Sequence, residues 1–259
     1  MLNPNNREAI LITRTSIPRL AGDVPWLTRP QMEEVDRAMV DDFGIPILQM
    51  MDQAGRNLAF LAVERFWGGK PSSPNVLIVA GPGGNGGGAL SGGGRLLEMG
   101  VNVAVTLTSP AGRFTPEASH FLVALEERDV PVEPLDKVDI EMFDLVVDGI
   151  LGYSLIGDPR EPAATLINRI NDSLTPVLSN DLPSGIEATS GRVGTPVINA
   201  DATLTIALPK QGVRELEAMP HVGDLYLGDI NVPPELYEQS FPGMGSINPF
   251  TQEQVVQIW

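Results

Sequence analysis

The sequence contains 259 residues, and its 33 acidic and 17 basic side chains give a formal net charge of −16. This charge repels phosphate backbones and anionic headgroups, so neither nucleic acid nor a membrane is an expected partner. The chain contains no cysteine, which excludes disulfides, thiolate metal sites and a cysteine nucleophile. It contains two histidines, so any bound metal is expected to have oxygen ligands.

The N-terminal part of the chain predicts an arm followed by two helices. Residues 1–25 combine Asn, Pro and Arg with a short apolar run at residues 10–12, and they lack an apolar stretch of the signal-peptide type. Together with the absence of cysteine, this predicts a cytoplasmic protein. Apolar residues at helical spacing predict one helix from Thr28 to about Gly44 and a second after Pro46.

Strands and helices alternate along the rest of the chain. The run VLIVAG after Asn75 is typical of a strand that is buried on both faces. This alternation predicts one α/β domain with a parallel sheet covered on both faces. The further predicted strands lie within residues 101–110, 144–152, 175–185, 200–210 and 224–233, and the further helices lie at about residues 117–127 and 162–171.

Polar or glycine-rich segments follow three of these strands. They are residues 81–89, residues 148–158 and residues 181–185. In an open parallel sheet, ligands bind beyond the carboxyl ends of the strands. We therefore expect the three segments to meet in one crevice.

The segment from Gly81 to Gly88 contains six glycines. Glycines in left-handed conformations allow backbone N–H groups to converge on an anion where a helix begins. The segment has neither the Lys-Ser/Thr pair of a Walker A loop nor a strict GxGxxG motif. From these residues alone, anion binding and a plain tight turn are equally good interpretations.

Two aspartates follow the next strands. Asp148 is compatible with a catalytic carboxylate, a cation ligand or a turn cap. Asp181 precedes Ser184 in a proline-containing turn, and both side chains are compatible with the same crevice or with turn chemistry alone.

Five segments of the chain form a recognisable series in their order and spacing. They are LTRPQMEEVDRAMVDDFGIPILQMMDQAGR, VLIVAGPGGNGGGAL, DLVVDGILGYSLIGDPREP, NDLPSGIEATSG and DATLTIALPKQG. The series resembles the NAD(P)HX epimerases, the YjeF amino-terminal domain family. The resemblance covers about residues 27–234 and implies a three-layer α/β/α Rossmann-like sandwich with a mostly parallel central sheet. It also implies interconversion of the R and S epimers of hydrated NADH and NADPH at ring carbon 6, followed by a separate dehydratase that acts on the S form.

The resemblance also implies roles for individual residues. Asp181 is the expected proton-transfer group, because a carboxylate in a partly closed pocket beside a bound anion can have a raised pKa. A potassium ion is expected on Asn85, Asp148 and Ser184, and a homodimer is expected. The residues expected to bind the nucleotide are Gly84, Asn85, Gly86, Gly87, Gly88, Gly152, Tyr153, Ser154, Leu155, Ile156, Gly157, Asp158 and Asp181.

The glycine-rich segment departs from the family pattern. The family typically has GPGNNGGDG where this chain has GPGGNGGGA, so Gly84 replaces Asn, Gly88 replaces Asp and Ala89 replaces Gly. Loss of a proton-transferring carboxylate costs about 10²-fold or more in rate. Residues 91–94 read SGGG, and three glycines at about 1 kcal/mol each weaken a helix there.

Three functional hypotheses follow from the resemblance and its departures. The chain is an epimerase of this family, a catalytically silent nucleotide-binding or protein-interaction scaffold, or an enzyme that has diverged to a related substrate. The expected organisation is an N-terminal arm at residues 1–25, the epimerase-like domain at 26–240 and a C-terminal extension at 241–259. A helix near residues 252–259, packed on a neighbouring subunit, is the expectation for that extension.

Overall fold

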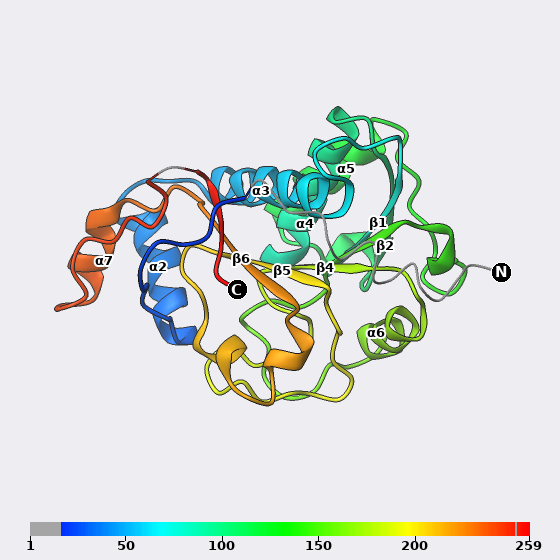
Figure 1. Cartoon of the computed structure of the whole chain (residues 1–259). Helices are drawn as coiled ribbons and strands as arrows, with labels where there is room; N and C mark the ends of the chain where they lie inside the picture. The colour runs from blue at the N-terminus through cyan, green and yellow to red at the C-terminus, as the bar shows by residue number, and fades with distance from the viewer. Residues whose placement is uncertain (1–16, 252) are drawn as a thin grey trace.

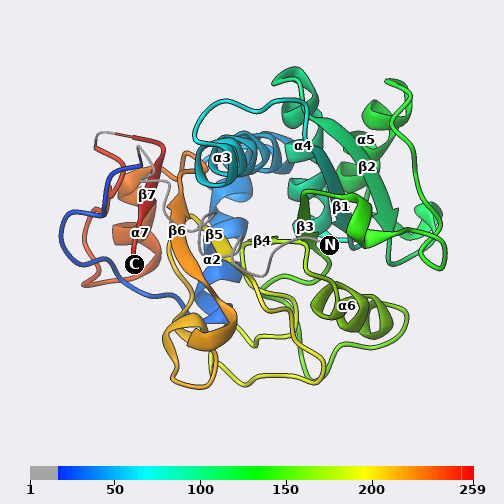
Figure 2. The ribbon, with the colours of Figure 1, turned by 45° about the vertical axis from the view of Figure 1, so that its right-hand side comes forward.

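The chain forms a single seven-stranded sheet in the order β2-β1-β3-β4-β5-β6-β7 (Figures 1 and 2). The computed structural model describes residues 17–251 and 253–259. Strands β1 to β6 are parallel, and β7 is antiparallel to β6. The predicted mostly parallel sheet is therefore confirmed. The strands are β1 (Asn75–Ala80), β2 (Asn102–Leu107), β3 (Leu145–Gly149), β4 (Val177–Asn180), β5 (Ala202–Ile206), β6 (Asp224–Gly228) and β7 (Val255–Gln257).

Helices cover both faces of this sheet, as predicted. Helices α3, α4 and α5 lie on one side and α6 lies on the other, as Figure 1 shows. Helices α2 and α7 contact each other, and α7 lies beside β7 at the end of the sheet. The α-helices are α2 (Arg29–Asp41), α3 (Ile47–Trp67), α4 (Gly84–Glu98), α5 (Pro116–Glu126), α6 (Ala163–Asp172) and α7 (Pro234–Ser240), and the 3₁₀ helices are η1 (Ala111–Arg113), η2 (Ile140–Met142), η3 (Gln211–Arg214) and η4 (Met219–His221).

Local sequence signals account for where the first helices begin and end. Thr28 caps α2 in a capping box with Gln31, and the first helical turn contains Pro30. Helix α3 ends at Trp67 and is capped by Gly68, which has a left-handed φ of 58° that a residue without Cβ adopts at little cost. These boundaries confirm the two helices predicted from Thr28 and Pro46.

The two faces of the sheet have separate apolar cores. On β1, Val76 and Ile78 face helices α3 to α5, whereas Leu77 and Val79 face α6. Because both faces are covered, the strand is apolar at every position after Asn75. None of the described helices is long and apolar enough to cross a membrane.

The C-terminal segment is a strand, so the helix predicted near residues 252–259 is wrong. Strand β7 pairs with β6, and Gln257 also exchanges backbone hydrogen bonds with Pro18 and Leu20. The indole rings of Trp26 and Trp259 stack with centroids 6.0 Å apart. Pairing with an exposed edge strand has outweighed the weak helical pattern of these few residues. The apolar run at residues 10–12 lies outside the described residues.

Candidate active site

The strand order creates a crevice between the carboxyl ends of β1 and β3. In a sheet of order 2-1-3-4-5, the connections from these two strands run to opposite sides, and this switch point is where such folds bind ligands. Helix α4 begins directly beyond β1, with Gly83 at its N-cap. Pro82 after β1 and Leu151 after β3 line one cavity of about 680 Å³. The three predicted segments therefore follow adjacent strands at one edge of the sheet.

Asp148 is completely buried at the end of β3 and holds four hydrogen bonds. Its Oδ1 accepts from the Ile150 amide (3.2 Å) and from Ser184 Oγ (2.6 Å). Its Oδ2 accepts from the Ser184 amide and from Ser179 Oγ, both at 2.9 Å. Burial raises the pKa of this carboxyl, and these hydrogen bonds act in the opposite direction. The register that places Asp148 opposite Ser179 explains one of the four contacts.

Asn85 joins Asp148 and Ser184 through the backbone of Leu151. Asn85 Nδ2 donates to the Leu151 carbonyl oxygen at 2.9 Å, and the Leu151 amide donates to Ser184 Oγ at 2.8 Å. The structure therefore brings together the three residues predicted as potassium ligands. Whether they bind that ion stays a prediction.

Asn180 is a member of this group that the sequence analysis missed. Its Nδ2 donates to the backbone oxygen of Asn85 (3.1 Å) and to Asn85 Oδ1 (2.9 Å). Its own Oδ1 is buried and has no hydrogen-bond partner among the described residues. The sequence signal that could have identified Asn180 was its polar side chain at the last position of a buried strand. We call Asp148, Ser179, Ser184, Asn85 and Asn180 the Asp148 cluster.

The Asn180 carboxamide lies beside Gly88. A Cβ built on Gly88 would lie 2.9 Å from Asn180 Nδ2, closer than real side chains approach. The family pattern has an aspartate at this position, and here the neighbouring strand supplies a polar side chain to the same space. The substitution has therefore not left an apolar gap.

The glycine-rich segment is the beginning of α4, which corrects the prediction of a loop with left-handed glycines. None of the glycines from Gly81 to Gly88 has a positive φ. Their small size instead permits close backbone approach. A Cβ on Gly81 would lie 2.0 Å from the Ile150 carbonyl oxygen, and one on Gly86 would lie 1.8 Å from the Gly81 carbonyl oxygen. The helix thus begins against the ends of β1 and β3.

The SGGG segment lies within the same helix and packs against α3. A Cβ on Gly92 would lie 2.9 Å from Leu58 Cδ2, and the Cβ of Ser91 would lie 2.6 Å from one built on Gly55. Close packing of the two helices buries apolar surface that offsets the low helix propensity of glycine. The weakening predicted from propensity has not prevented helix formation.

Asp181 forms a buried ion pair with Lys210. Asp181 directly follows β4 with a left-handed φ of 65°, and it is 4% exposed. The Lys210 ammonium, which is 0% exposed, contacts Asp181 Oδ1 and donates to the Ile206 carbonyl oxygen at 2.9 Å. Lys210 was not predicted as a site residue, although a lysine shortly beyond a buried strand was a usable signal.

Tyr153 and Asp36 extend this charged group towards α2. The Tyr153 hydroxyl donates to Asp36 Oδ2. Burial raises the pKa of Asp36, and burial together with the Asp36 charge raises the pKa of Tyr153. Lys210 and Asp181 also lie within electrostatic reach of Asp36. We call Asp36, Tyr153, Asp181 and Lys210 the Lys210 cluster.

The remaining predicted ligand residues of the 152–158 segment divide between two environments. A Cβ on Gly152 would lie 3.1 Å from Asn85 Cβ, so this glycine lies against the beginning of α4. Leu155, Ile156 and Asp158 line the cavity, and Asp158 pairs with Arg192 at 2.7 Å. Ser154 is exposed, and Gly157 forms a turn with a φ of 80°.

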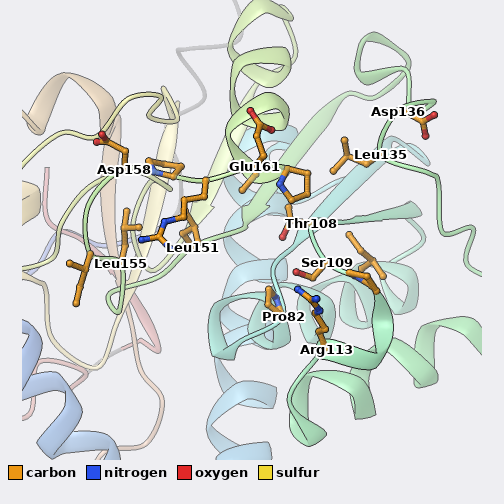
Figure 3. Close-up of a pocket in the computed structure, with 17 residues that line it drawn as sticks. Pro82, Thr108, Ser109, Arg113, Leu135, Asp136, Leu151, Leu155, Asp158 and Glu161 are labelled. Carbon is orange, nitrogen blue, oxygen red and sulfur yellow. The ribbon is translucent and has the colours of Figure 1, made fainter.

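The cavity lies next to both clusters and is not formed by them. Its lining includes neither Asp148, Ser184 nor Asp181. Leu151 lines it and is held by the Asp148 cluster from behind. Figure 3 shows Pro82, Ser109 and Arg113 on one wall and Leu151, Leu155 and Asp158 on the other. Ser109 and Arg113 belong to no motif recognised in the sequence.

The donor atoms of the Asp148 cluster are compatible with a monovalent cation. Within the described ranges, no group of three or more His, Cys, Asp or Glu side chains could hold a metal ion. The cluster instead contains one buried carboxylate, which has no cationic partner among the described residues and whose oxygens accept four hydrogen bonds, and the unpartnered Oδ1 of Asn180. Amide, hydroxyl and carboxylate oxygens are ligands for hard cations. The residues therefore fit the predicted ion.

A protein-family model matches more than half of this chain. The family model described as YjeF-related protein N-terminus matches residues 47–212. The chain belongs to this family. The matched range contains α3, the glycine-rich start of α4, both clusters except Asp36, and the cavity.

Similar proteins support the same membership. An NAD(P)H-hydrate epimerase of Dehalogenimonas lykanthroporepellens is 37% identical over 83% of this chain and 85% of its own length. An NAD(P)H-hydrate epimerase of Plasmodium knowlesi is 31% identical over 89% of this chain and 78% of its own length. The bifunctional NAD(P)H-hydrate repair enzyme Nnr of Salinibacter ruber is 28% identical over 91% of this chain, which spans 46% of that enzyme.

A solved structure confirms the fold. The crystal structure of yeast YNL200c superimposes with a TM-score of 0.77 at 22% identity and covers 91% of this chain and 100% of its own. At this identity the likeness shows the fold alone. It confirms the Rossmann-like α/β architecture.

Proposed function

We propose that this chain is an NAD(P)H-hydrate epimerase that interconverts the R and S epimers of hydrated NADH and NADPH. The observation that carries the proposal is the naming of its 37% and 31% identical relatives, of which the chain covers 85% and 78%. The buried Asp181–Lys210 pair at the end of β4 supports it, since the reaction needs a proton donor and acceptor. The silent-scaffold and related-substrate alternatives are not favoured.

The reaction requires paired proton transfers at the oxygen bound to ring carbon 6. The C6–O bond breaks as the leaving hydroxyl takes a proton and departs as water, while the lone pair of the neighbouring ring nitrogen forms a C=N double bond to C6. A water molecule then adds to C6 from the opposite ring face and loses a proton, the C=N electron pair returns to the nitrogen, and proton transfer within the Asp181–Lys210 pair restores the donor and the acceptor. Lys210 supplies the donor and Asp181 the acceptor, and low exposure keeps bulk water from competing. Asp181 is therefore the proposed catalytic residue.

The binding residues follow from the elements around this pair. Gly84 to Gly88 begin α4 at the switch point, where helical N–H groups favour the negative charge of a diphosphate. The segment from Gly152 to Asp158 covers the end of β3 next to the cavity. Both segments are proposed to contact the nucleotide.

Asn85, Asp148 and Ser184 are proposed to hold a potassium ion. The ion would supply positive charge that offsets both the buried carboxylate and the phosphates of the ligand. The four hydrogen bonds on Asp148 fix the carboxylate, and Asn85 and Ser184 fix the backbone of Leu151. These hydrogen bonds between protein groups thus hold the proposed oxygen ligands in place before an ion binds.

Three finer expectations belong to the same proposal. The protein acts in the cytoplasm, it forms a homodimer, and its S product is consumed by a separate dehydratase. The dehydratase follows from the chemistry, since epimerisation alone leaves the cofactor hydrated.

A coupled assay tests the proposed activity. The native chain is incubated with the R epimer of hydrated NADH and an S-specific dehydratase, and NADH formation is followed by absorbance. The native chain is expected to accelerate NADH formation, and Asp181→Asn is expected to lower the rate by about 10²- to 10⁴-fold. Asp172→Asn, at the exposed end of α6, is the matched control with native activity. No acceleration by the native chain would refute the proposal.

A further inference from the structure

Two arginines line the switch-point cavity without an acidic partner. Arg113 and Arg160 both belong to its wall. Neither guanidinium has an ion pair or hydrogen bond with the residues that the structure describes, whereas Arg29, Arg37 and Arg192 each pair with a carboxylate. In a chain with 33 acidic and 17 basic residues, two unpaired cations in one cavity indicate a site for an anion that comes from outside the chain.

The two arginines approach the cavity from opposite sides of β1. Arg113 lies in η1 after β2, and Arg160 follows β3. Strand β1 lies between β2 and β3, so the strands that lead to the two arginines are about 10 Å apart at an interstrand spacing of about 4.8 Å. Both residues line the same cavity, so an elongated anion bound there has both arginines in its wall.

Neutral donors share the same wall. Ser109 lines the cavity beside Arg113 in Figure 3, and its hydroxyl makes no hydrogen bond with the residues that the structure describes. Thr108, which also lines the cavity, is buried, and its Oγ1 makes only a 3.4 Å contact with the Ala80 carbonyl oxygen. Guanidinium and hydroxyl groups together are donors suited to phosphate oxygens.

The acidic residues of the cavity are mostly engaged elsewhere. The Asp158 carboxylate pairs with Arg192 and accepts a hydrogen bond from the Thr195 amide. Glu161 Oε2 accepts a hydrogen bond from the Thr165 amide on α6. Asp136 is exposed to solvent, as are Arg113 and Arg160, so water screens the charges of all three in the unliganded protein. These interactions leave the two arginines available to an anionic ligand.

We propose that Arg113 and Arg160 bind the diphosphate bridge of a dinucleotide in this cavity. The proposal rests on the proposed epimerase function and deepens it, because it assigns the anionic half of the substrate to the cavity next to Asp181. The nicotinamide half then extends along Leu151 towards the Lys210 cluster. The diphosphate thereby anchors the ligand away from the reacting ring.

Calorimetry with ADP-ribose tests the site without depending on catalysis. ADP-ribose carries the diphosphate bridge and lacks the nicotinamide ring. The native protein is expected to bind it, and Arg113→Ala and Arg160→Ala are each expected to weaken binding about tenfold or more, with a shallower dependence on salt. Arg56→Ala, an exposed arginine on α3 outside the cavity lining, is the matched control. Unliganded melting temperatures confirm that each variant is folded.

Steady-state kinetics separates this site from the proposed activity. For hydrated NADH, the two cavity variants are expected to raise KM about tenfold or more with little change in kcat. Native-like ADP-ribose affinity in both variants, or no ADP-ribose binding by the native protein, would overturn the diphosphate site. Arginine-dependent ADP-ribose binding without epimerase activity would instead retain this site and refute the proposed function.

Discussion

The two polar clusters lie side by side at the end of β4 and differ in how their charge is balanced. Consecutive residues contribute to them, because Asn180 belongs to the Asp148 cluster and Asp181 to the Lys210 cluster. The buried carboxylate of Asp148 is surrounded by hydroxyl and amide donors. The buried carboxylate of Asp181 instead has an ammonium partner. The left-handed backbone of Asp181 turns the two side chains towards different neighbours.

This difference in charge balance indicates that the two clusters have different roles. Four hydrogen bonds hold Asp148 in one position, and Leu151 is held through Ser184 and Asn85, so the Asp148 cluster fixes the cavity wall. An ammonium–carboxylate pair has a donor and an acceptor that can exchange a proton with a ligand. The first cluster is therefore suited to positioning and the second to chemistry. Variants of the Asp181–Lys210 pair should therefore show the difference between the clusters most clearly in epimerase activity.

The largest expected effect comes from Lys210→Met, which breaks the ion pair. Removal of one partner leaves a buried carboxylate unpaired, and we expect a loss of about 3–5 kcal/mol in the free energy of unfolding. Epimerase activity is expected to fall by about 10²- to 10⁴-fold. Urea unfolding and the coupled assay measure the two effects.

The double variant Asp181→Asn/Lys210→Met distinguishes stability from chemistry. It removes both charges, so most of the lost stability is expected to return while activity stays low. Lys137→Met, at an exposed position, is the control. If the double variant recovered activity along with stability, the Asp181–Lys210 pair would have a structural role only. The two clusters would then not differ in function.

A smaller effect is expected from Gly88→Asp, which restores the family residue. Its Cβ would lie 2.9 Å from Asn180 Nδ2, and Asn180 is buried and hydrogen-bonded to Asn85. Overpacking of this kind costs about 1–3 kcal/mol, so the melting temperature should fall without a gain in activity. Adding Asn180→Ala provides space, and the double variant should regain stability. Equal melting temperatures for Gly88→Asp and the native chain would contradict this account.

The elements of the fold were predictable because their signals are local. The apolar run of β1, the capping box of α2 and the glycine after α3 each specify an element from a few neighbouring residues. Strand β7 was not predictable, because its conformation depends on pairing with β6 and with the chain at Pro18. Such long-range pairing leaves little trace in a short sequence.

The site was predictable only in part. Asp148, Asn85 and Ser184 stood out because they follow or begin elements at one edge of the sheet, and the structure brings them together. Asn180 and Lys210 were missed, because their importance lies in partners that are 95 and 29 residues away. The glycines were assigned to a loop because propensity alone does not show how closely α3 packs on α4.

The smallest expected effect on stability comes from the ionisation of Asp36 in the Lys210 cluster. Burial raises the folded-state pKa of Asp36 above its ordinary value of 3.8, with smaller opposing effects from Tyr153 and Lys210. The stability that this group contributes is therefore complete below about pH 3.8 and is lost as the pH rises through the folded-state pKa. Asp36→Asn cannot ionise and can still accept the Tyr153 hydrogen bond through Oδ1. The variant should be slightly more stable than the native chain at neutral pH, by urea unfolding.

Tyr153→Phe alters the same Tyr153–Asp36 contact and is expected to change stability in the opposite direction. It removes the hydroxyl that donates to Asp36 and leaves the partly buried carboxylate without that bond, so stability at neutral pH should fall. Asp36→Asn and Tyr153→Phe should therefore shift the unfolding midpoint in opposite directions at pH 7. Below pH 3.8, where Asp36 is neutral, Asp36→Asn should converge with the native chain, whereas Tyr153→Phe should stay less stable because it lacks the hydrogen bond at every pH. Parallel pH profiles for all three proteins would show that Asp36 does not ionise in this range, and the Lys210 cluster would then hold one carboxylate charge instead of two.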